Sequence, residues 1–418
     1  MGCRGRGSLH GANDASNHER NPVSHATLTK TAAIDLTNAT DTGWPLRLEP
    51  RELELVDDEH PFLAVDLGTI RDRSQVLQAA FRGRVSLRYA VKCNSAPEVL
   101  RAVFESGSGF EIASAAELAL AVAAGADPAT LVYSNPVKPP AHVARAAQAG
   151  VGLFVVDGPA EIEKIAEWAP GSAVMIRVVV PETGSAFPLS AKFGLPISDG
   201  PALLRRARLA GLRPVGITFH VGSQCTDARA WARAVDACAP VFAAAIEQGH
   251  PLTVLDLGGG FPARYSGSPV PTMAEIGRHT LAAVDRLPGR PPTLLAEPGR
   301  GLVAEAGVLA TTVIGLEDRG DRRWVFIDVG GYNGLMEAAQ TGGRWPFPLR
   351  TSRPTGRLVP CTVTGPSCDS SDTVLLDAEL PADLHLGDRV YIGATGAYTT
   401  VYAAPFNGFP APTPLYVG

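Results

Sequence analysis

The sequence predicts a (β/α)₈ barrel followed by a C-terminal domain of antiparallel β structure. Between about residues 70 and 300, eight short apolar runs alternate with segments long enough for one helix each. Runs that are apolar on both faces and alternate with helices are typical of a parallel sheet covered by helices. Beyond about residue 303 the runs become β-branched and are broken by Gly, Pro and Asp, which is typical of antiparallel strands.

The eight apolar runs follow one another in a regular order: LRYAVK, GFEIAS, TLVYSN, GLFVVD, AVMIRVVV, VGITFHVG, LTVLDLG and PTLLAEPG. One of the segments between them, AAELALAVAAGADP, is rich in Ala and closes with Gly and Pro, as helices do. Eight strand–helix units favour a closed barrel, and a doubly wound sheet is the structural alternative.

These changes in composition and apolar pattern divide the chain into four segments. Residues 1–40 are rich in Gly, Asn, Ser and His, so we expect a disordered tail. Residues 41–66 hold the strand-like stretches LRLEPRELELV and PFLAVDL, which we expect to join the β domain. The barrel is expected over residues 67–302 and the β domain over residues 303–418, where GRLVPCTVTG, DTVLLDAEL and GDRVYIGATGAY stand out.

Composition favours a protein of the reducing cytoplasm and argues against nucleic acid as its main partner. The chain has 37 Lys and Arg against 42 Asp and Glu, a net charge of -5 that argues weakly against a nucleic-acid partner. Six scattered Cys are too few for a disulfide scaffold and lack the spacing of a zinc site. No apolar run reaches membrane-spanning length, and the first 40 residues lack the apolar stretch of a signal peptide.

Polar residues cluster where the predicted barrel strands end, which is where barrel active sites lie. Lys92 follows the first strand directly. It is either a lysine at the barrel rim or an amine held in an apolar site, where its pKa would fall and it could form a Schiff base. His220 ends the sixth strand and Glu297 ends the eighth.

The seventh strand runs into three consecutive glycines, Gly258–Gly260. Glycines let backbone N–H groups approach an anion closely, although a tight turn alone would also explain them. Phosphate sites in such barrels frequently use the loops after strands seven and eight. Pyridoxal phosphate needs a lysine, phosphate donors and an acid near its ring nitrogen, so this inventory suits that cofactor. Glu297 is the candidate acid, and His220 can stack on the ring.

Ten ordered stretches resemble the alanine-racemase-fold amino-acid decarboxylases, and within them the ornithine decarboxylase branch: YAVKCN, GFEIASAAEL, YSNPVK, AKFG, FHVGSQ, LDLGGGFP, EPGR, GPSCDSSD, GAYT and FNGF. They run from Tyr89 to Phe409 and so cover nearly all of the chain except the tail. The resemblance implies decarboxylation of a basic amino acid, L-ornithine or L-lysine, to a diamine and CO₂, with pyridoxal phosphate as cofactor.

The resemblance also implies a role for each matching residue. Lys92 should bond the cofactor, His220 should stack on its pyridine ring, and Glu297 should pair with the ring nitrogen. The residues expected to hold its phosphate are Ser223, Gly258, Gly259, Gly260, Gly299, Arg300 and Tyr398. The residues expected to support the site are Glu111, Glu117 and Arg177. Glu111 is a departure, since the family usually has Asp there.

Further implied roles belong to a homodimer with shared active sites. Cys368 and Asp369 should enter the site from the other subunit, where the Cys reprotonates the carbanion and the Asp takes the distal amine of the substrate. Lys192 should pair with Asp372 across the interface.

The second anchor that the family has for the distal amine is a departure in this chain. Asp328 stands one position before the expected slot, which Val329 occupies. Asp328 and Tyr398 are kept as candidate substrate contacts, with the alternative that Asp369 alone recognises the amine. The exact substrate therefore stays open.

Three other functions compete with decarboxylation of L-ornithine or L-lysine. A related diamino acid is one alternative: D-ornithine, D-lysine, diaminopimelate or a specialised metabolite. An amino-acid racemase would need an opposing base, commonly Tyr, where GPSCDSSD supplies a Cys and an Asp. A regulatory homologue without cofactor is disfavoured by the presence of Lys92, Glu297 and Cys368.

Overall fold

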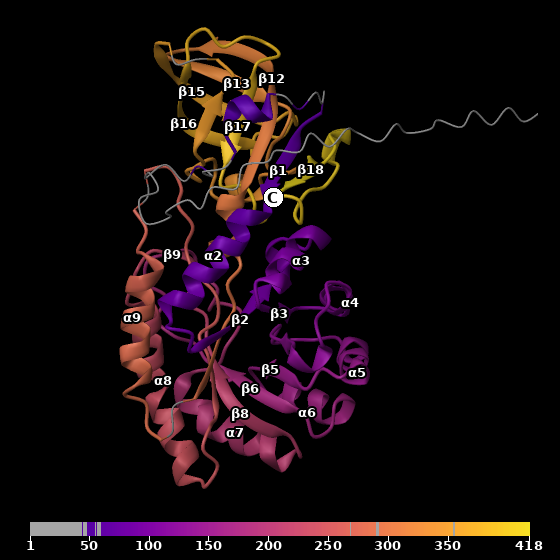
Figure 1. Cartoon of the computed structure of the whole chain (residues 1–418), viewed down its shortest axis with the longest axis vertical. Helices are drawn as coiled ribbons and strands as arrows, with labels where there is room; N and C mark the ends of the chain where they lie inside the picture. Colours follow the sequence, from indigo (N-terminus) through magenta and orange to yellow (C-terminus); the bar gives the residue numbers. More distant parts are fainter. Residues whose placement is uncertain are drawn as a thin grey trace, which may run out of the picture. The chain divides into compact units, whose positions relative to one another are not determined.

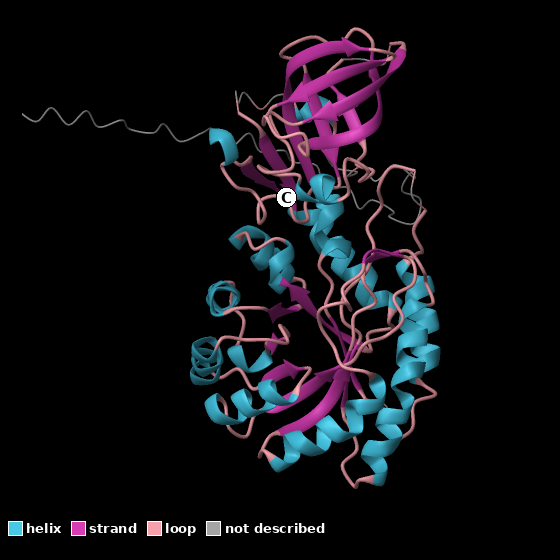
Figure 2. Ribbon diagram, turned by 180° about the vertical axis from the view of Figure 1, so that it is seen from behind, coloured by secondary structure: helices cyan, strands magenta, loops and turns pink. Residues whose placement is uncertain are grey.

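The computed structural model describes Trp44, residues 48–54, Val56 and residues 60–418, apart from residues 268, 290–291 and 354–355. The tail expected over residues 1–40 lies outside the described residues. Figures 1 and 2 show the arrangement of the helices and strands. Among the described residues, no helix combines the length and the apolar character needed to cross a lipid bilayer.

Eight parallel strands close into a barrel, in the order β10-β11-β2-β3-β4-β5-β6-β8. Their bounds are β2 Val85–Ala90, β3 Gly109–Ile112, β4 Val132–Tyr133, β5 Leu153–Val156, β6 Ala173–Arg177, β8 Arg213–Thr218, β10 Val254–Asp256 and β11 Thr293–Ala296. Each corresponds to one of the eight apolar runs. The expected barrel is therefore confirmed, and the doubly wound alternative is wrong.

Helices surround the barrel strands in Figure 2. Their bounds are α2 Leu67–Ala80, α3 Pro97–Glu105, α4 Ala115–Ala123, α5 Pro140–Ala149, α6 Pro159–Trp168, α7 Gly200–Leu209, α8 Ala230–Glu247 and α9 Met273–Val284. Helices α3, α5 and α6 each begin with Pro, whose fixed φ suits the first turn of a helix. In α3, Val99, Leu100 and Val103 are fully buried, so one apolar face of the helix packs on the barrel core.

A second sheet forms the mostly antiparallel β domain. Its strands are β1 Phe62–Asp66, β12 Gly307–Arg319, β13 Arg322–Ile327, β14 Leu349–Thr351, β15 Leu358–Thr364, β16 Thr373–Pro381, β17 Arg389–Gly393 and β18 Thr413–Val417. Strand β1 pairs antiparallel with β12 and parallel with β18, so the chain passes through this sheet before it enters the barrel. The pair β13 and β15 is parallel as well.

The stretch near residue 50 was predicted as a strand, and this prediction is wrong. The described part contains the short helix α1, Pro50–Leu53. Pro50 has no N–H to give to a strand ladder, and its fixed φ suits a helix start. The indole Nε1 of Trp44 donates to the Leu48 carbonyl over 2.8 Å, which ties down the chain just before the helix.

One short main-chain segment of the β domain, residues 396–398, meets the barrel beside the first barrel strand. The amide of Asn94 donates to the Gly396 carbonyl over 2.9 Å, and the N–H of Tyr398 donates to the Cys93 carbonyl over 2.9 Å. Both barrel residues lie in or next to the 3₁₀ turn η2, Val91–Cys93, which carries Lys92. The segment around Tyr398 is therefore fixed at the mouth of the barrel.

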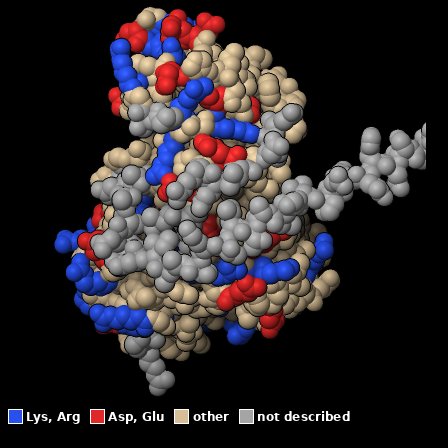
Figure 3. Space-filling model, turned by 45° about the horizontal axis from the view of Figure 1, so that its top comes forward, with Lys and Arg blue, Asp and Glu red and all other residues tan. Residues whose placement is uncertain are grey.

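On the face shown in Figure 3, acidic and basic side chains are interspersed.

Candidate active site

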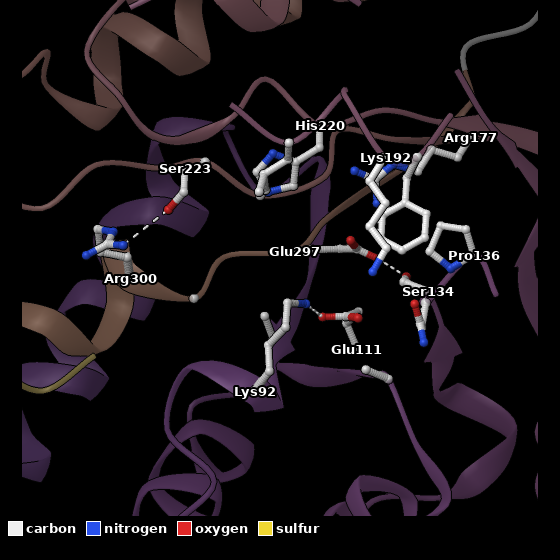
Figure 4. Close-up of a pocket in the computed structure, with 18 of the residues that line it drawn as sticks. Lys92, Glu111, Ser134, Pro136, Arg177, Lys192, His220, Ser223, Glu297 and Arg300 are labelled. Atoms are coloured by element: carbon white, nitrogen blue, oxygen red, sulfur yellow. Dashed lines mark hydrogen bonds and ion pairs between the residues drawn. The ribbon is translucent and has the colours of Figure 1, made fainter. Parts of the chain in front are cut away.

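A cavity of about 360 Å³ opens at the carboxyl ends of the barrel strands. Its walls come from successive strand ends and, at Tyr398, from the β domain. Figure 4 shows ten of the lining residues with labels. The predicted site residues that line it are Lys92, Glu111, Arg177, His220, Ser223, Gly259, Gly260, Glu297, Gly299, Arg300 and Tyr398. The fold thus gathers into one pocket residues that are spread over about 300 positions of the sequence.

Lys92 and Glu111 form an ion pair at the floor of the cavity, and Figure 4 shows their charged ends facing each other. The Glu111 side chain is buried, whereas 49% of the Lys92 side chain is exposed toward the cavity. Removal from bulk water lowers the pKa of the Lys92 amine, but the carboxylates of Glu111 and Glu297 outweigh it and the net shift is upward. The lowered pKa expected from an apolar site is therefore wrong for this state, because two acids face the amine.

Glu297 lies directly after β11 and is surrounded by other acids. Its Oε1 accepts a hydrogen bond from the hydroxyl of Ser134. Burial, followed by the negative charges of Asp256 and Glu111, raises the pKa of Glu297 well above its usual value. The positive charge of Lys92 and the hydroxyl of Ser134 act in the opposite direction. A cationic group bound beside Glu297 would therefore be needed to favour its ionised form strongly.

His220 presents a neutral imidazole to the cavity. Its Nδ1 accepts a hydrogen bond from the Gly222 N–H over 2.9 Å, and this bond orients the ring. Burial, together with the positive charges of Arg177 and Lys92, lowers the pKa of His220 to about 3. A flat, uncharged ring of this kind can stack on the face of an aromatic ligand.

The glycine loop after β10 is built for close approach of the backbone. Gly258 has φ +61°, and a Cβ there would lie 1.9 Å from the Phe219 carbonyl oxygen. Gly260 has φ +96°, and its Cβ would lie 2.5 Å from the carbonyl oxygen of Gly222. No other residue fits these two positions, since both the conformation and the space exclude a side chain. Gly258 itself does not appear among the cavity-lining residues, although Gly259 and Gly260 do.

Arg300 begins the short helix α10, Arg300–Val303, and is held on several sides. Both Nη atoms donate to the carboxylate of Glu337, Nη1 donates to the Tyr265 hydroxyl over 2.9 Å, and Nη2 reaches Ser223 Oγ over 3.3 Å. Its guanidinium carbon lies 5.1 Å from the ring centre of Tyr398. Arg300 is 4% exposed, yet its Nε has no hydrogen-bond partner.

These features test whether the residues fit a bound phosphate. A buried donor without a partner is rare in proteins and points to a ligand that completes the site. The Nε of Arg300, the hydroxyl of Ser223 and the loop residues Gly259 and Gly260 supply donors beside the cavity, which is the chemistry that a phosphate requires. The residues therefore fit the phosphate end of pyridoxal phosphate.

Cys368, Asp369 and Glu117 lie away from this cavity in their own chain. Cys368 is exposed, in the loop after β15, with its Sγ 3.7 Å from Asn407 Oδ1. The exposed carboxylate of Asp369 accepts hydrogen bonds from the Tyr332 hydroxyl over 2.9 Å and from the Ser371 N–H over 2.8 Å. Glu117, in the first turn of α4, accepts a hydrogen bond from the Ala113 N–H over 2.6 Å and so stabilises the loop after β3.

Asp328 and Asp372 are both engaged inside the β domain. Asp328 Oδ1 accepts the Thr312 N–H over 2.9 Å, which fixes this carboxylate to the sheet and outside the cavity lining. Asp372 is 2% exposed and accepts the N–H groups of Gly331 and Ser367 over 2.6 and 3.0 Å. The expectations that Asp328 anchors the substrate and that Asp372 pairs with Lys192 of another subunit are therefore not supported. Both carboxylates already accept hydrogen bonds from backbone N–H groups of their own chain.

Several residues of the cavity were not predicted from the sequence. They lie after β4 and in the segment between β6 and β8, and they are Ser134, Asn135, Pro136, Pro188, Leu189, Ala191 and Phe193. Lys192, expected at a subunit interface, also lines the cavity. Ser134 follows a buried strand just as Lys92 does, so the same rule would have found it. Nothing in the local sequence indicates that Glu337 would reach Arg300, 37 positions earlier.

Comparison with known proteins places this site in a family. Residues 67–304 match the family described as pyridoxal-dependent decarboxylase, pyridoxal binding domain. The lysine/ornithine decarboxylase of Selenomonas ruminantium is 36% identical over 361 residues, which cover 85% of this chain and 89% of that protein.

Two solved structures resemble the whole fold. The structure of SrLDC in complex with PLP and cadaverine has a TM-score of 0.81 and 34% identity, and the match covers 89% of this chain and 94% of that one. The lysine/ornithine decarboxylase of Vibrio vulnificus, complexed with putrescine, has a TM-score of 0.80 and 30% identity, over 89% of this chain and 99% of that one. The chain belongs to the pyridoxal-dependent decarboxylases and has their barrel and β domain.

Proposed function

We propose that this protein decarboxylates a basic amino acid, L-ornithine or L-lysine, to the corresponding diamine and CO₂. The observation that carries the proposal is the cavity, in which the Lys92 amine, the half-buried acid Glu297 and the donors around Arg300 face one space. Relatives that bind cadaverine and putrescine, the diamines of these two amino acids, support the choice of substrate.

Each cavity residue has a task in this proposal. When bound, pyridoxal phosphate supplies an electron sink for the pair released as the carboxylate leaves the substrate. Lys92 would hold the cofactor covalently, and Ser223, Arg300 and the glycine loop would hold its phosphate. His220 would support the ring by stacking, and Glu297 would hold a proton on the ring nitrogen. Arg177 and Glu111 would balance the charges around it.

The other two expected roles require a second copy of the chain. Cys368 is exposed and outside the cavity of its own chain, so its thiol could return a proton to the substrate carbon only in a neighbouring subunit. Asp369 lies beside it, and its pKa is lowered by hydrogen bonds from Ser371 and Tyr332, so it stays ionised. We propose a symmetric dimer in which each β domain presents Cys368 and Asp369 to the site of its partner.

The proposal is tested with a panel of amino acids, with CO₂ and amine both measured. The panel contains L- and D-ornithine, L- and D-lysine, L-arginine, diaminopimelate and L-norleucine. We expect equal amounts of CO₂ and diamine from L-ornithine or L-lysine and none from norleucine. Loss of optical activity without CO₂ would instead indicate a racemase. A protein that takes up no pyridoxal phosphate and shows no visible absorbance would be a regulatory homologue.

Asp369→Ala is expected to weaken recognition of the distal amine. A hydrogen bond to a charged partner contributes about 1.5–3 kcal/mol, so KM should rise about 10- to 150-fold. The affinity for pyridoxal phosphate should stay within about twofold of wild type, since Asp369 lies outside the cavity of its own chain. The control is Asp377→Ala, an exposed carboxylate on β16 of the same domain that pairs with Arg322. Unchanged discrimination between ornithine and norleucine would refute the role.

A mixture of two inactive variants tests the shared site. Lys92→Ala and Cys368→Ala homodimers should both be nearly inactive. After subunit exchange in equal amounts, half of the dimers are mixed and each has one intact site, so about a quarter of wild-type activity should return. Exchange is followed independently with two affinity tags. Demonstrated exchange without recovered activity would mean that both residues act within one chain, or that Cys368 has no catalytic role.

A further inference from the structure

We propose that Ser134 is a positioning residue for Glu297: its hydroxyl holds one carboxylate oxygen so that the other faces the ring nitrogen of the cofactor. This inference rests on the role proposed above for Glu297. Ser134 follows β4 directly, whereas Glu297 follows β11, and strands β2 and β3 lie between these two in the barrel. The bond from Ser134 Oγ to Glu297 Oε1 therefore spans part of the barrel mouth, as the dashed line in Figure 4 shows.

The backbone that carries Ser134 is fixed before any ligand binds. Its N–H donates to the Ile112 carbonyl of β3 over 3.1 Å, and the residue is only 7% exposed. Four positions later, the fully buried Lys138 donates from Nζ to the carbonyls of Asn135, Pro136 and Val155 over 2.8, 3.2 and 2.6 Å. These bonds fasten the loop after β4 to the next strand. The Ser134 hydroxyl is thus presented at a set position, which is what a positioning residue needs.

The charges around Glu297 explain why such a donor matters. Asp256 on β10 and Glu111 on β3 are negative neighbours, and Lys92 and Arg177 are positive ones. Asp256 cannot turn away, since its oxygens accept the Gly258 N–H over 3.0 Å and the Thr218 hydroxyl over 2.9 Å. Burial and the two acids favour the protonated form of Glu297, whereas a hydrogen bond donated to its oxygen favours the ionised form.

The hydroxyl also decides which oxygen is free. Oε1 is engaged by Ser134, and the protonated carboxyl group also shares a hydrogen bond with Asp256. Once Glu297 is ionised, two carboxylates repel each other, so the oxygen that is not held by Ser134 can accept a proton-bearing ring nitrogen. Without the hydroxyl, the carboxylate would lose both the fixed rotation and part of the stabilisation of its charge. The reaction rate should then fall while substrate binding stays, because the charge on Glu297 matters most as electrons move into the ring.

The test compares Ser134→Ala with Ser134→Thr, which keeps the hydroxyl. For Ser134→Ala we expect kcat to fall about tenfold, with KM and the affinity for pyridoxal phosphate within about threefold of wild type. The second readout does not depend on turnover. The pH at which the absorbance of the bound cofactor titrates on the acid side should move upward by about one unit, because loss of a donor raises the pKa of a carboxylate. Ser134→Thr should restore both.

Two controls make each outcome decisive. Ser108→Ala removes another buried hydroxyl, one that contacts Ser74 Oγ at 3.0 Å, and should change neither readout. In the Glu297→Gln background, Ser134→Ala should lower kcat less than about twofold more, since its effect passes through the missing carboxylate. A full additional tenfold loss, an unshifted titration, no rescue by Thr, or a thermal midpoint far below that of Ser108→Ala would overturn the proposal. Wild-type protein that releases no CO₂ would refute the proposed function, while the absorbance titration still decides the role of Ser134.

Discussion

Lys92→Ala is expected to lower kcat by at least about 10³-fold, equivalent to about 4 kcal/mol in the activation free energy. The substitution removes the amine that faces the cavity and also leaves the buried Glu111 without its ion-pair partner. Turnover is measured as CO₂ released under saturating substrate, and cofactor content is measured separately by absorbance.

Two further variants show whether the amine or merely its charge is needed. Lys92→Arg keeps a positive charge beside Glu111 but cannot act as a neutral amine, since the pKa of a guanidinium is above about 12. It should be as inactive as Lys92→Ala. Lys164→Ala, on the outer helix α6 where Nζ pairs with Glu161, should keep activity. Substantial turnover in Lys92→Arg would contradict a covalent role for Lys92.

Glu297→Gln is expected to lower kcat about 10²- to 10³-fold while pyridoxal phosphate stays bound. The amide has nearly the same shape but cannot carry the negative charge that keeps a proton on the ring nitrogen. In the present state, burial and two neighbouring acids raise the pKa of Glu297, so the ionised form depends on a positive partner beside it. The control is Glu163→Gln on the surface of α6, which pairs with Arg206. A kcat near that of wild type would show that the role is wrong.

The acid side of the pH profile follows from the same pKa shift. In the cavity without cofactor, burial and two neighbouring acids hold the pKa of Glu297 above its usual value. Where the positive ring nitrogen of the cofactor offsets only part of this rise, the carboxylate is lost on acidification at a higher pH than that of an exposed Glu. We therefore expect kcat to fall with decreasing pH through a limb that disappears in Glu297→Gln. The limb is measured from initial rates of CO₂ release between pH 5 and 8 in buffers of constant ionic strength, a range estimated from ordinary group pKa values.

Much of the fold could be predicted because each barrel strand and helix is indicated by its own short stretch of sequence. Each barrel strand is an apolar run with a helix behind it, and β2 to β11 fall where those runs lie. The exceptions depend on contacts between distant segments. The two-stranded antiparallel sheet of β7, Ser185–Phe187, and β9, Ser223–Cys225, pairs Phe187 with Ser223, 36 positions apart, so no local turn motif predicts it. Helix α1 was missed because alternating Leu and Glu resemble a strand on either side of Pro50.

The candidate site was predictable to the extent that strand ends converge. Lys92, His220 and Glu297 each follow a barrel strand, so the closed barrel alone brings them to one mouth. The electrostatics could not be predicted in the same way. Whether the pKa of Lys92 rises or falls depends on Glu111 being buried beside it, and the engagement of Asp328 depends on the Thr312 amide of a neighbouring strand. Such pairings are tertiary, and a single sequence does not contain them.

The most direct test of the central claim is to find where the cofactor is attached. The protein is loaded with pyridoxal phosphate, reduced with borohydride, digested with trypsin and mapped by mass spectrometry. The chain has five lysines, Lys30, Lys92, Lys138, Lys164 and Lys192, so the assignment is unambiguous. We expect the pyridoxyl group on one peptide, residues 89–101, left uncut at its modified Lys92. Labelling of any other lysine, or no labelled peptide at all, would contradict the account.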